Sequence, residues 1–172
     1  IVFQDPTSAL NPRLSVEHSI AEALANRGVP RAERRARVEE LLALTGIRPA
    51  HRRRRPGAFS GGQKQRIVIA RALATDPQFM VLDEPVSNLD VSIQAQILNL
   101  LMDLKARFGL TYLFISHDLN VIGYVSDRIA VMKEGRIVEQ EDADRLIEQP
   151  THPYTRELFA EAPVFHDRRG RP

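Results

Sequence analysis

Two adjacent carboxylates, Asp83 and Glu84, follow the apolar run FMVL at residues 79–82. A short continuous apolar run is typical of a strand that is buried on both faces of a sheet. Neighbouring residues on a strand point to opposite sides, so the two acids suit different tasks. Asp83 is placed to hold Mg²⁺ directly or through water, and Glu84 to polarise an attacking water as a general base. The alternative is a solvated strand end, and the pair alone does not decide between the two.

The stretch SGGQ at residues 60–63 opens a strongly patterned helix. Ser60 and Gln63 have the spacing of a capping box, in which each side chain accepts a backbone N–H of the other residue. An ordinary helix start therefore explains these two residues. Gly61 and Gly62 weaken that explanation, because glycine is unfavourable in a helix unless something must approach the backbone. Free N–H groups at a helix N-terminus attract anions, and this stretch predicts a phosphate site.

A second apolar run, LTYLFIS at residues 110–116, is followed by His117. This histidine has the same position after a strand as Asp83. A hydrogen-bond donor there could reach a terminal phosphate, whereas we interpret the other histidines as structural or exposed. Between the two runs lies SNLD, residues 87–90, whose Asn88 and Asp90 suit a turn and a helix cap.

These residues require an α/β fold in which strands alternate with helices. Residues 5–13 hold two prolines and read as a loop, and residues 128–132 and 136–140 flank KEG as a hairpin. The apolar periodicity predicts helices over residues 15–26, 32–45, 61–74, 91–108 and 119–125, and strands over 79–83 and 110–116.

The composition is that of a globular protein, with 43% hydrophobic residues among 172 and a formal net charge of +2. The absence of cysteine excludes disulfides and thiolate metal sites, and no apolar run is long enough to span a bilayer. The chain starts with IVFQ, which has no initiator Met and reads as the end of an apolar strand. We therefore expect it to be a fragment of a longer protein.

Five segments in one order make the chain resemble the nucleotide-binding subunit of ABC transporters. The longer stretches FQDPTSALNPR, DEPVSNLDVSIQAQILNLL and PTHPYTRELF are similar to the branch that imports oligopeptides and dipeptides, which nickel and glutathione importers share. The segments are VFQDP as the Q-loop, FSGGQKQR as the signature, FMVLDE as Walker B, SNLD as the D-loop and ISHD as the H-loop.

The resemblance implies a P-loop NTPase-like fold with an incomplete core sheet and a small α-helical lobe. It divides the chain into four parts. These are the strand end and Q-loop at 1–13, the helical lobe at 14–58, the signature helix and catalytic core at 59–140, and a C-terminal helical extension at 141–172.

The resemblance also implies roles for individual residues, with ATP and Mg²⁺ as cofactors. Gln4 and Asp83 would bind Mg²⁺, Glu84 would be the catalytic base, and His117 would clamp the γ-phosphate. In this family the nucleotide lies between two subunits, head to tail. The residues that would contact ATP held by the partner subunit, or pass contacts to that subunit, are Ser60, Gly61, Gly62, Gln63 and Asp90.

The implied partners are a second ATP-binding subunit, identical or related, two transmembrane permease subunits and an extracytoplasmic substrate-binding protein. The chain would lie on the cytoplasmic face of the inner or plasma membrane as a peripheral subunit. Nucleic acid is not an expected partner.

The sequence departs from the family because it contains no G-x-x-x-x-G-K-[ST] loop for the β- and γ-phosphates. We therefore expect the 172 residues alone to be inactive as an ATPase. A different hypothesis is a non-catalytic interaction fragment that contributes only the signature to a partner. A third is nucleic-acid binding through HRRRR at residues 51–55, although runs of charge are usually solvated faces.

Overall fold

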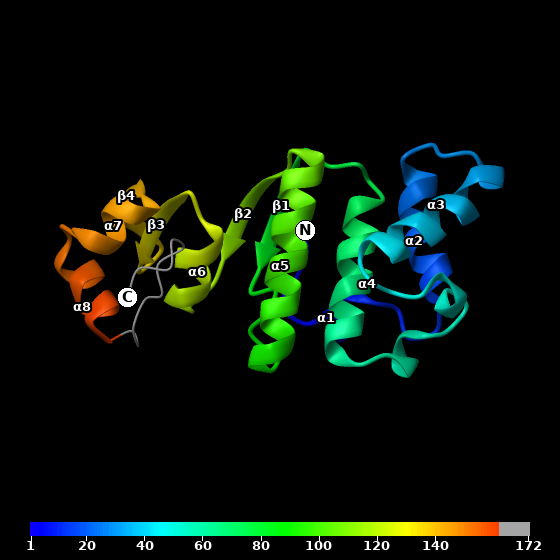
Figure 1. The fold of residues 1–172 in the computed structure, drawn as a ribbon, viewed down its shortest axis with the longest axis horizontal. Helices are drawn as coiled ribbons and strands as arrows, with labels where there is room; N and C mark the ends of the chain where they lie inside the picture. The colour runs from blue at the N-terminus through cyan, green and yellow to red at the C-terminus, as the bar shows by residue number, and fades with distance from the viewer. Residues whose placement is uncertain (162–172) are drawn as a thin grey trace. The chain divides into compact units, whose positions relative to one another are not determined.

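A computed structural model describes residues 1–161, and these residues form an α/β fold with two compact units (Figure 1). The first unit covers Ile1–Leu113 and the second begins at Phe114, and each is described by itself. The helices are α1 (Pro6–Ala9), α2 (Val16–Asn26), α3 (Arg31–Leu44), α4 (Gly61–Leu73), α5 (Val91–Phe108), α6 (Leu119–Val125), α7 (Ala143–Glu148) and α8 (Pro153–Glu161). The strands are β1 (Phe79–Asp83), β2 (Thr111–Ile115), β3 (Arg128–Lys133) and β4 (Arg136–Asp142), and short 3₁₀ turns lie at Pro49–His51 and Pro56–Ala58.

The elements that the apolar periodicity predicts are present, with ends that differ by one or two residues. The predicted loop at residues 5–13 differs, because it contains the short helix α1. Asp5 caps this helix by accepting hydrogen bonds from the backbone N–H groups of Thr7 at 2.8 Å and Ser8 at 3.1 Å. Pro6 occupies the first helical position, where its missing N–H costs nothing.

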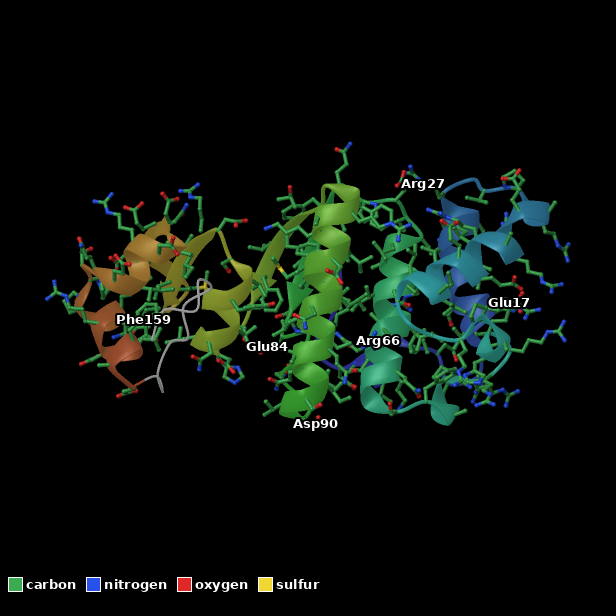
Figure 2. All side chains as sticks on the ribbon, in the orientation of Figure 1. Glu17, Arg27, Arg66, Glu84, Asp90 and Phe159 are labelled. Atoms are coloured by element: carbon green, nitrogen blue, oxygen red, sulfur yellow. The ribbon has the colours of Figure 1, made fainter. Side chains whose placement is uncertain are left out.

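Helix α4 is the centre of the first unit, since it packs against α1, α2, α3 and α5 (Figure 1). Its residues Ile67, Ile69 and Ala70 are completely buried. Arg66, labelled in Figure 2, joins this helix to two neighbours by donating to the Thr45 carbonyl at 3.1 Å and to Oε1 of Gln96 at 3.2 Å. The helix that carries the signature is therefore fixed by the rest of the unit.

Helix α5 begins and ends as the sequence predicts. Asp90 caps its start by accepting the N–H of Ile93 at 3.0 Å, and Gly109 ends it with φ of 62°, a left-handed conformation that favours glycine. Its buried stripe consists of Ile97, Leu98, Leu101 and Leu104. Phe108, the last residue of the helix, is 43% exposed.

The strands of the first unit are less buried than predicted. Strand β1 lies beside β2 in a two-stranded sheet, and Val2 adds a parallel bridge to Leu82. Met80 and Leu82 are buried, whereas Phe79 on the opposite side is 55% exposed. Burial on both faces was therefore wrong for this strand, because within residues 1–161 the side that carries Phe79 is incompletely covered.

The second unit is built on the predicted hairpin of β3 and β4. Lys133 pairs with Arg136, and the turn between them consists of Glu134 with φ of 50° and Gly135 with φ of 77°. Two consecutive residues with positive φ are the mark of a type I′ turn, whose twist matches that of a hairpin. The core of this unit consists of Ile122, Ile129, Val131, Ala143 and Leu146.

The predicted four-part division of the chain stays a prediction. Residues 162–172, the last part of the predicted C-terminal extension, lie outside the described residues. Among the residues that the structure describes, every helix is too short or too polar to cross a membrane.

We predict that Asp90→Ala lowers the free energy of unfolding by about 1 kcal/mol, because it removes the side-chain acceptor of the α5 cap. Urea denaturation followed by circular dichroism measures this change. Asp90→Asn is the matched control, since asparagine caps helices as well as aspartate does. An asparagine variant as unstable as the alanine variant would contradict the capping role.

Glu139 on β4 holds the segment before α8. Its carboxylate accepts the N–H and hydroxyl of Thr151, both at 2.7 Å, and the N–H of His152 at 3.1 Å. The pKa of Glu139 is lowered from 4.5 to about 2, first by the Thr155 hydroxyl and then by Thr151 and His152, against an opposing effect of burial. The Thr155 hydroxyl is buried and does not meet hydrogen-bond geometry. The hydrogen bonds from Thr151 and His152 are therefore the contacts that stabilise the ionised form of Glu139.

A lowered pKa means that ionised Glu139 stabilises the fold above pH 4.5 and that this contribution is lost as the pH falls towards 2. We expect the amide resonances of Thr151 and His152 to titrate with a midpoint well below pH 4.5 in an NMR experiment, because their hydrogen bonds favour the ionised carboxylate. Glu139→Gln should abolish this titration, and Glu148→Gln, at an exposed position of α7, should leave it in place. A midpoint near pH 4.5 in the unaltered chain would show that these hydrogen bonds do not hold the carboxylate.

Candidate functional site

Gln4, Asp83 and Glu84 lie at one end of the small sheet of the first unit. The backbone N–H of Val2 donates to the Val81 carbonyl at 2.8 Å, and that of Asp83 donates to the Val2 carbonyl at 2.9 Å. Because Val2 pairs in parallel with Leu82, the chain reaches Gln4 and Glu84 two residues beyond the same bridge. Gln4 is exposed and the two acids are half-buried. The fold therefore gathers side chains that are about eighty positions apart in the sequence.

Glu84 has a backbone conformation that the sequence does not reveal. Its φ is 48°, in the left-handed region that non-glycine residues rarely adopt. The Glu84 carbonyl accepts the hydroxyl of Ser87 at 3.1 Å, and Oε2 of Glu84 is buried. Backbone strain of this kind gathers at functional sites, where the surrounding structure maintains it. The turn after β1 thus fixes the Glu84 side chain, labelled in Figure 2, at the strand end.

The start of α4 has the predicted capping box. Ser60 Oγ accepts the N–H of Gln63 at 3.4 Å, and Gln63 Oε1 accepts the N–H of Ser60 at 3.1 Å. The N–H groups of Gly61 and Gly62 belong to the first turn and have no carbonyl partner within the helix. Gly61 is exposed, whereas Gly62 is buried. The first turn can therefore present N–H groups to an anion without losing its cap.

The oxygen atoms of Gln4 and Asp83 fit a magnesium ion. Magnesium takes oxygen ligands, keeps several of its waters and needs only one or two protein side chains when a phosphate completes its shell. Asp83 is half-buried at the strand end, and Gln4 is exposed two residues beyond the bridge of Val2 to Leu82. Residues 1–161 contain no group of three or more histidine, cysteine, aspartate or glutamate residues that could hold a metal by themselves. The site is thus suited to an ion that arrives with a phosphate ligand.

His117 belongs to the second unit, where it is exposed between β2 and α6. The next residue, Asp118, caps α6 by accepting the N–H of Asn120 at 2.9 Å. The described structure places His117 after a strand, as predicted. Its role towards a nucleotide stays a prediction.

Asp90 has the capping role that its place in SNLD predicted, and its exposed carboxylate lies at the end of the turn that starts at Glu84 (Figure 2). Within the first unit, Asp83, Glu84 and Asp90 thus lie on the end of β1 and the turn that follows it, and Gln4 lies on the segment that pairs with β1 through Val2.

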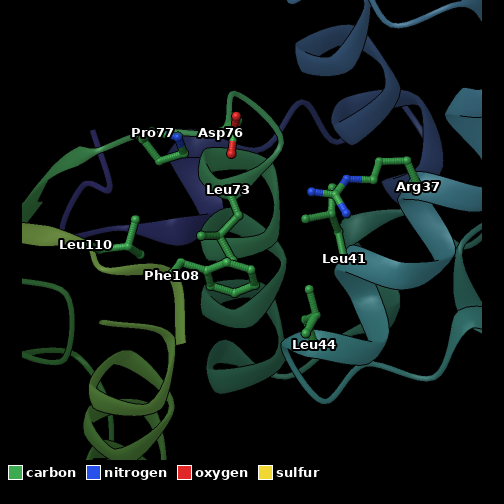
Figure 3. Close-up of a pocket in the computed structure, with 8 residues that line it drawn as sticks. All are labelled: Arg37, Leu41, Leu44, Leu73, Asp76, Pro77, Phe108 and Leu110. Carbon is green, nitrogen blue, oxygen red and sulfur yellow. The ribbon is translucent and has the colours of Figure 1, made fainter. Parts of the chain in front are cut away.

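A cavity of about 70 Å³ in the first unit lies elsewhere (Figure 3). Leu73 and Phe108, which line it, are the last residues of α4 and α5. At 1.5 Å per residue, these ends are about 20 Å and about 27 Å along the helices from Ser60 and Asp90. This cavity therefore has no part in the candidate site.

The four arginines at residues 52–55, before the signature, differ in burial. Nε of Arg52 lies 3.4 Å from Glu17 and 3.3 Å from Glu39, and its side chain is only 13% exposed. Arg53, Arg54 and Arg55 are exposed. One arginine thus holds the helical lobe together, and the other three match a solvated face. Nucleic-acid binding gains no support from this arrangement.

The chain is similar to known proteins over nearly all of its length. A family model described as "ABC transporter" matches residues 1–87. The oligopeptide transport ATP-binding protein OppF of Bacillus subtilis is 52% identical over 95% of the chain and 54% of that protein. The dipeptide transport ATP-binding protein DppF of Lactococcus lactis is 52% identical over 95% of the chain and 53% of that protein.

A solved structure extends the similarity to the fold. The ATP-binding cassette MJ0796, in a dimeric post-hydrolysis state bound to ADP and Pi, matches with a TM-score of 0.68 and 31% identity. This match covers 83% of the chain and 62% of MJ0796. The chain spans about half the length of the two transport proteins that it matches. The family model covers half of the chain, from Gln4 through the signature to Glu84, and the chain therefore belongs to the ABC transporter family.

Proposed function

We propose that the chain is part of an ATP-binding subunit that hydrolyses ATP and energises a membrane importer. The observation that carries this proposal is the strand end at which Gln4, Asp83 and Glu84 come together, in a unit whose α4 starts with an exposed glycine turn. The names of the Bacillus and Lactococcus relatives, both ATP-binding proteins for transport, support it.

Each residue has a distinct role in this proposal. Glu84 takes a proton from the attacking water as general base. Gln4 and Asp83 hold Mg²⁺, which neutralises charge on the phosphates when it is bound. His117 donates to the γ-phosphate, so that its contact depends on whether that phosphate is present.

The signature residues serve a nucleotide that is held by a second subunit. Ser60, Gly61, Gly62 and Gln63 contact its γ-phosphate through the free N–H groups of the first turn of α4 and through polar side chains. Asp90 passes contacts across the same interface. The dimeric state of MJ0796 supports such a pair, which is either identical or related subunits. ATP binding then closes the dimer and hydrolysis reopens it.

An importer of this kind needs partners besides the second ATP-binding subunit. Two permease subunits cross the membrane, and an extracytoplasmic binding protein delivers the substrate. The chain is peripheral on the cytoplasmic face. Oligopeptides or dipeptides are the proposed substrates because two relatives are named for them, and nickel and glutathione are the alternatives within the same branch.

The upstream coding sequence separates this proposal from a non-catalytic interaction fragment. We expect a G-x-x-x-x-G-K-[ST] loop in frame before Ile1, because affinity and catalysis need that loop together with Mg²⁺. A stop codon, or an unrelated start that lacks the loop, would favour the fragment that only contributes its signature to a partner.

We predict that Glu84→Gln lowers kcat for phosphate release by about 10²- to 10⁴-fold in the polypeptide encoded by the whole reading frame, because it removes the general base. Steady-state phosphate release at saturating Mg·ATP measures the change. Glu33→Gln, at an exposed position of α3, is the matched control and should not change kcat. Equal rates for the Glu84 variant and the unaltered enzyme would exclude the proposed base.

A further inference from the structure

Gly62 lies against α5 more closely than any side chain would allow. A Cβ atom at this position would be closer than 3.0 Å to Cγ2 of Ile93, a separation that real Cβ atoms do not show. Gly62 has an ordinary negative φ, so its backbone conformation does not demand glycine. Contact with Ile93 therefore explains why residue 62 is glycine.

Gly61 has a different reason to be glycine. A Cβ atom there would lie 3.5 Å from Cδ2 of Leu89, which is ordinary van der Waals contact, and the residue is exposed. Packing within the chain thus permits alanine at residue 61 and excludes it at residue 62. Of the two signature glycines, Gly61 is exposed and Gly62 packs against α5.

Ile93 and Leu89 are held in place by the turn after Glu84. The N–H of Ile93 donates to Asp90 at 3.0 Å, and Nε2 of Gln94 donates to the Leu89 carbonyl at 2.9 Å. Ser87 closes the same turn onto the Glu84 carbonyl at 3.1 Å. Hydrogen bonds therefore hold the segment from Glu84 to Ile93 in one conformation. The Ile93 side chain at the end of this segment contacts Gly62 in the first turn of α4.

We propose that Ile93 is a positioning residue for the signature, because its Cγ2 methyl group closes against Gly62 and fixes the first turn of α4 relative to the turn that carries Glu84. This role rests on the proposed function, in which that first turn contacts the γ-phosphate on a partner subunit. The β-branch carries the contact. Leucine has as many carbon atoms as isoleucine but has no methyl group at Cγ2, so Ile93→Leu removes the contact without shortening the side chain.

The packing is tested first, in the polypeptide encoded by the whole reading frame, by urea denaturation of Gly62→Ala, Ile93→Leu and the double variant. We expect Gly62→Ala to raise the unfolding equilibrium constant at least about tenfold, as overpacking does. The double variant should recover most of this loss, since the methyl group has moved from one side of the contact to the other. Gly61→Ala is the matched control and should not be destabilised. Additive effects of the two changes would overturn the contact, because additivity marks independent sites.

The positioning role is tested next, by the kinetics of phosphate release in the polypeptide of the whole reading frame. Ile93→Leu should lower kcat by about tenfold to a hundredfold, the usual cost of a small misplacement, and change KM by less than about twofold. Leu100→Ala, at another half-buried position of α5, is the control and should not change kcat. The double variant should recover part of kcat.

The outcomes separate the two proposals. An Ile93→Leu variant that is folded and has an unchanged kcat would overturn the positioning role, and the proposed function would stand. Phosphate release that does not depend on Glu84 would overturn the proposed function, and with it the positioning role. The denaturation result would then still report the contact between Gly62 and Ile93.

Discussion

The close approach of the first turns of α4 and α5 is the constraint on which the candidate site depends. Gly62 leaves room for Ile93, and Ile93 is held by the Asp90 cap, so the start of the signature helix and the end of the turn after β1 are fixed against one another. Helix α4 is also held by α1, α2 and α3. Its exposed first residue, Gly61, can therefore face a ligand while the rest of the helix carries the packing of the first unit.

A second constraint is the bridge between Val2 and Leu82, which brings two distant segments of the chain to one place. Two backbone hydrogen bonds, at 2.8 and 2.9 Å, are enough to set Gln4 beside Asp83 and Glu84. The turn at this strand end has an unusual local geometry, because Glu84 has a left-handed φ and its carbonyl accepts the hydroxyl of Ser87. The amide of Gln4 and the carboxylate of Asp83 are oxygen ligands of the kind that Mg²⁺ takes when a phosphate completes its shell.

The sequence predicted the features that depend on local spacing. The capping box of Ser60 and Gln63, the cap at Asp90, the end of α5 at Gly109 and the hairpin turn before Arg136 all follow from residue types at short separations. It did not predict features that depend on the tertiary structure. The φ of Glu84 is imposed by the turn around it. Residue 62 is glycine because the side chain of Ile93, thirty-one positions away, packs against it. The exposure of Phe79 depends on which segments cover the sheet. Apolar runs reveal that a strand can be buried, but they do not reveal on how many sides.

We propose that the 172 residues do not hold Mg·ATP by themselves, although they carry the signature and the strand end with Asp83 and Glu84, because they contain no G-x-x-x-x-G-K-[ST] loop. The most direct test is Mg·ATP binding to the purified 172-residue chain by calorimetry, with phosphate release followed in parallel and Glu84→Gln as the control. We expect no tight binding of Mg·ATP and no phosphate release above that of Glu84→Gln. Tight binding with release that Glu84→Gln abolishes would contradict it, because another part of these 172 residues would then cradle the phosphates.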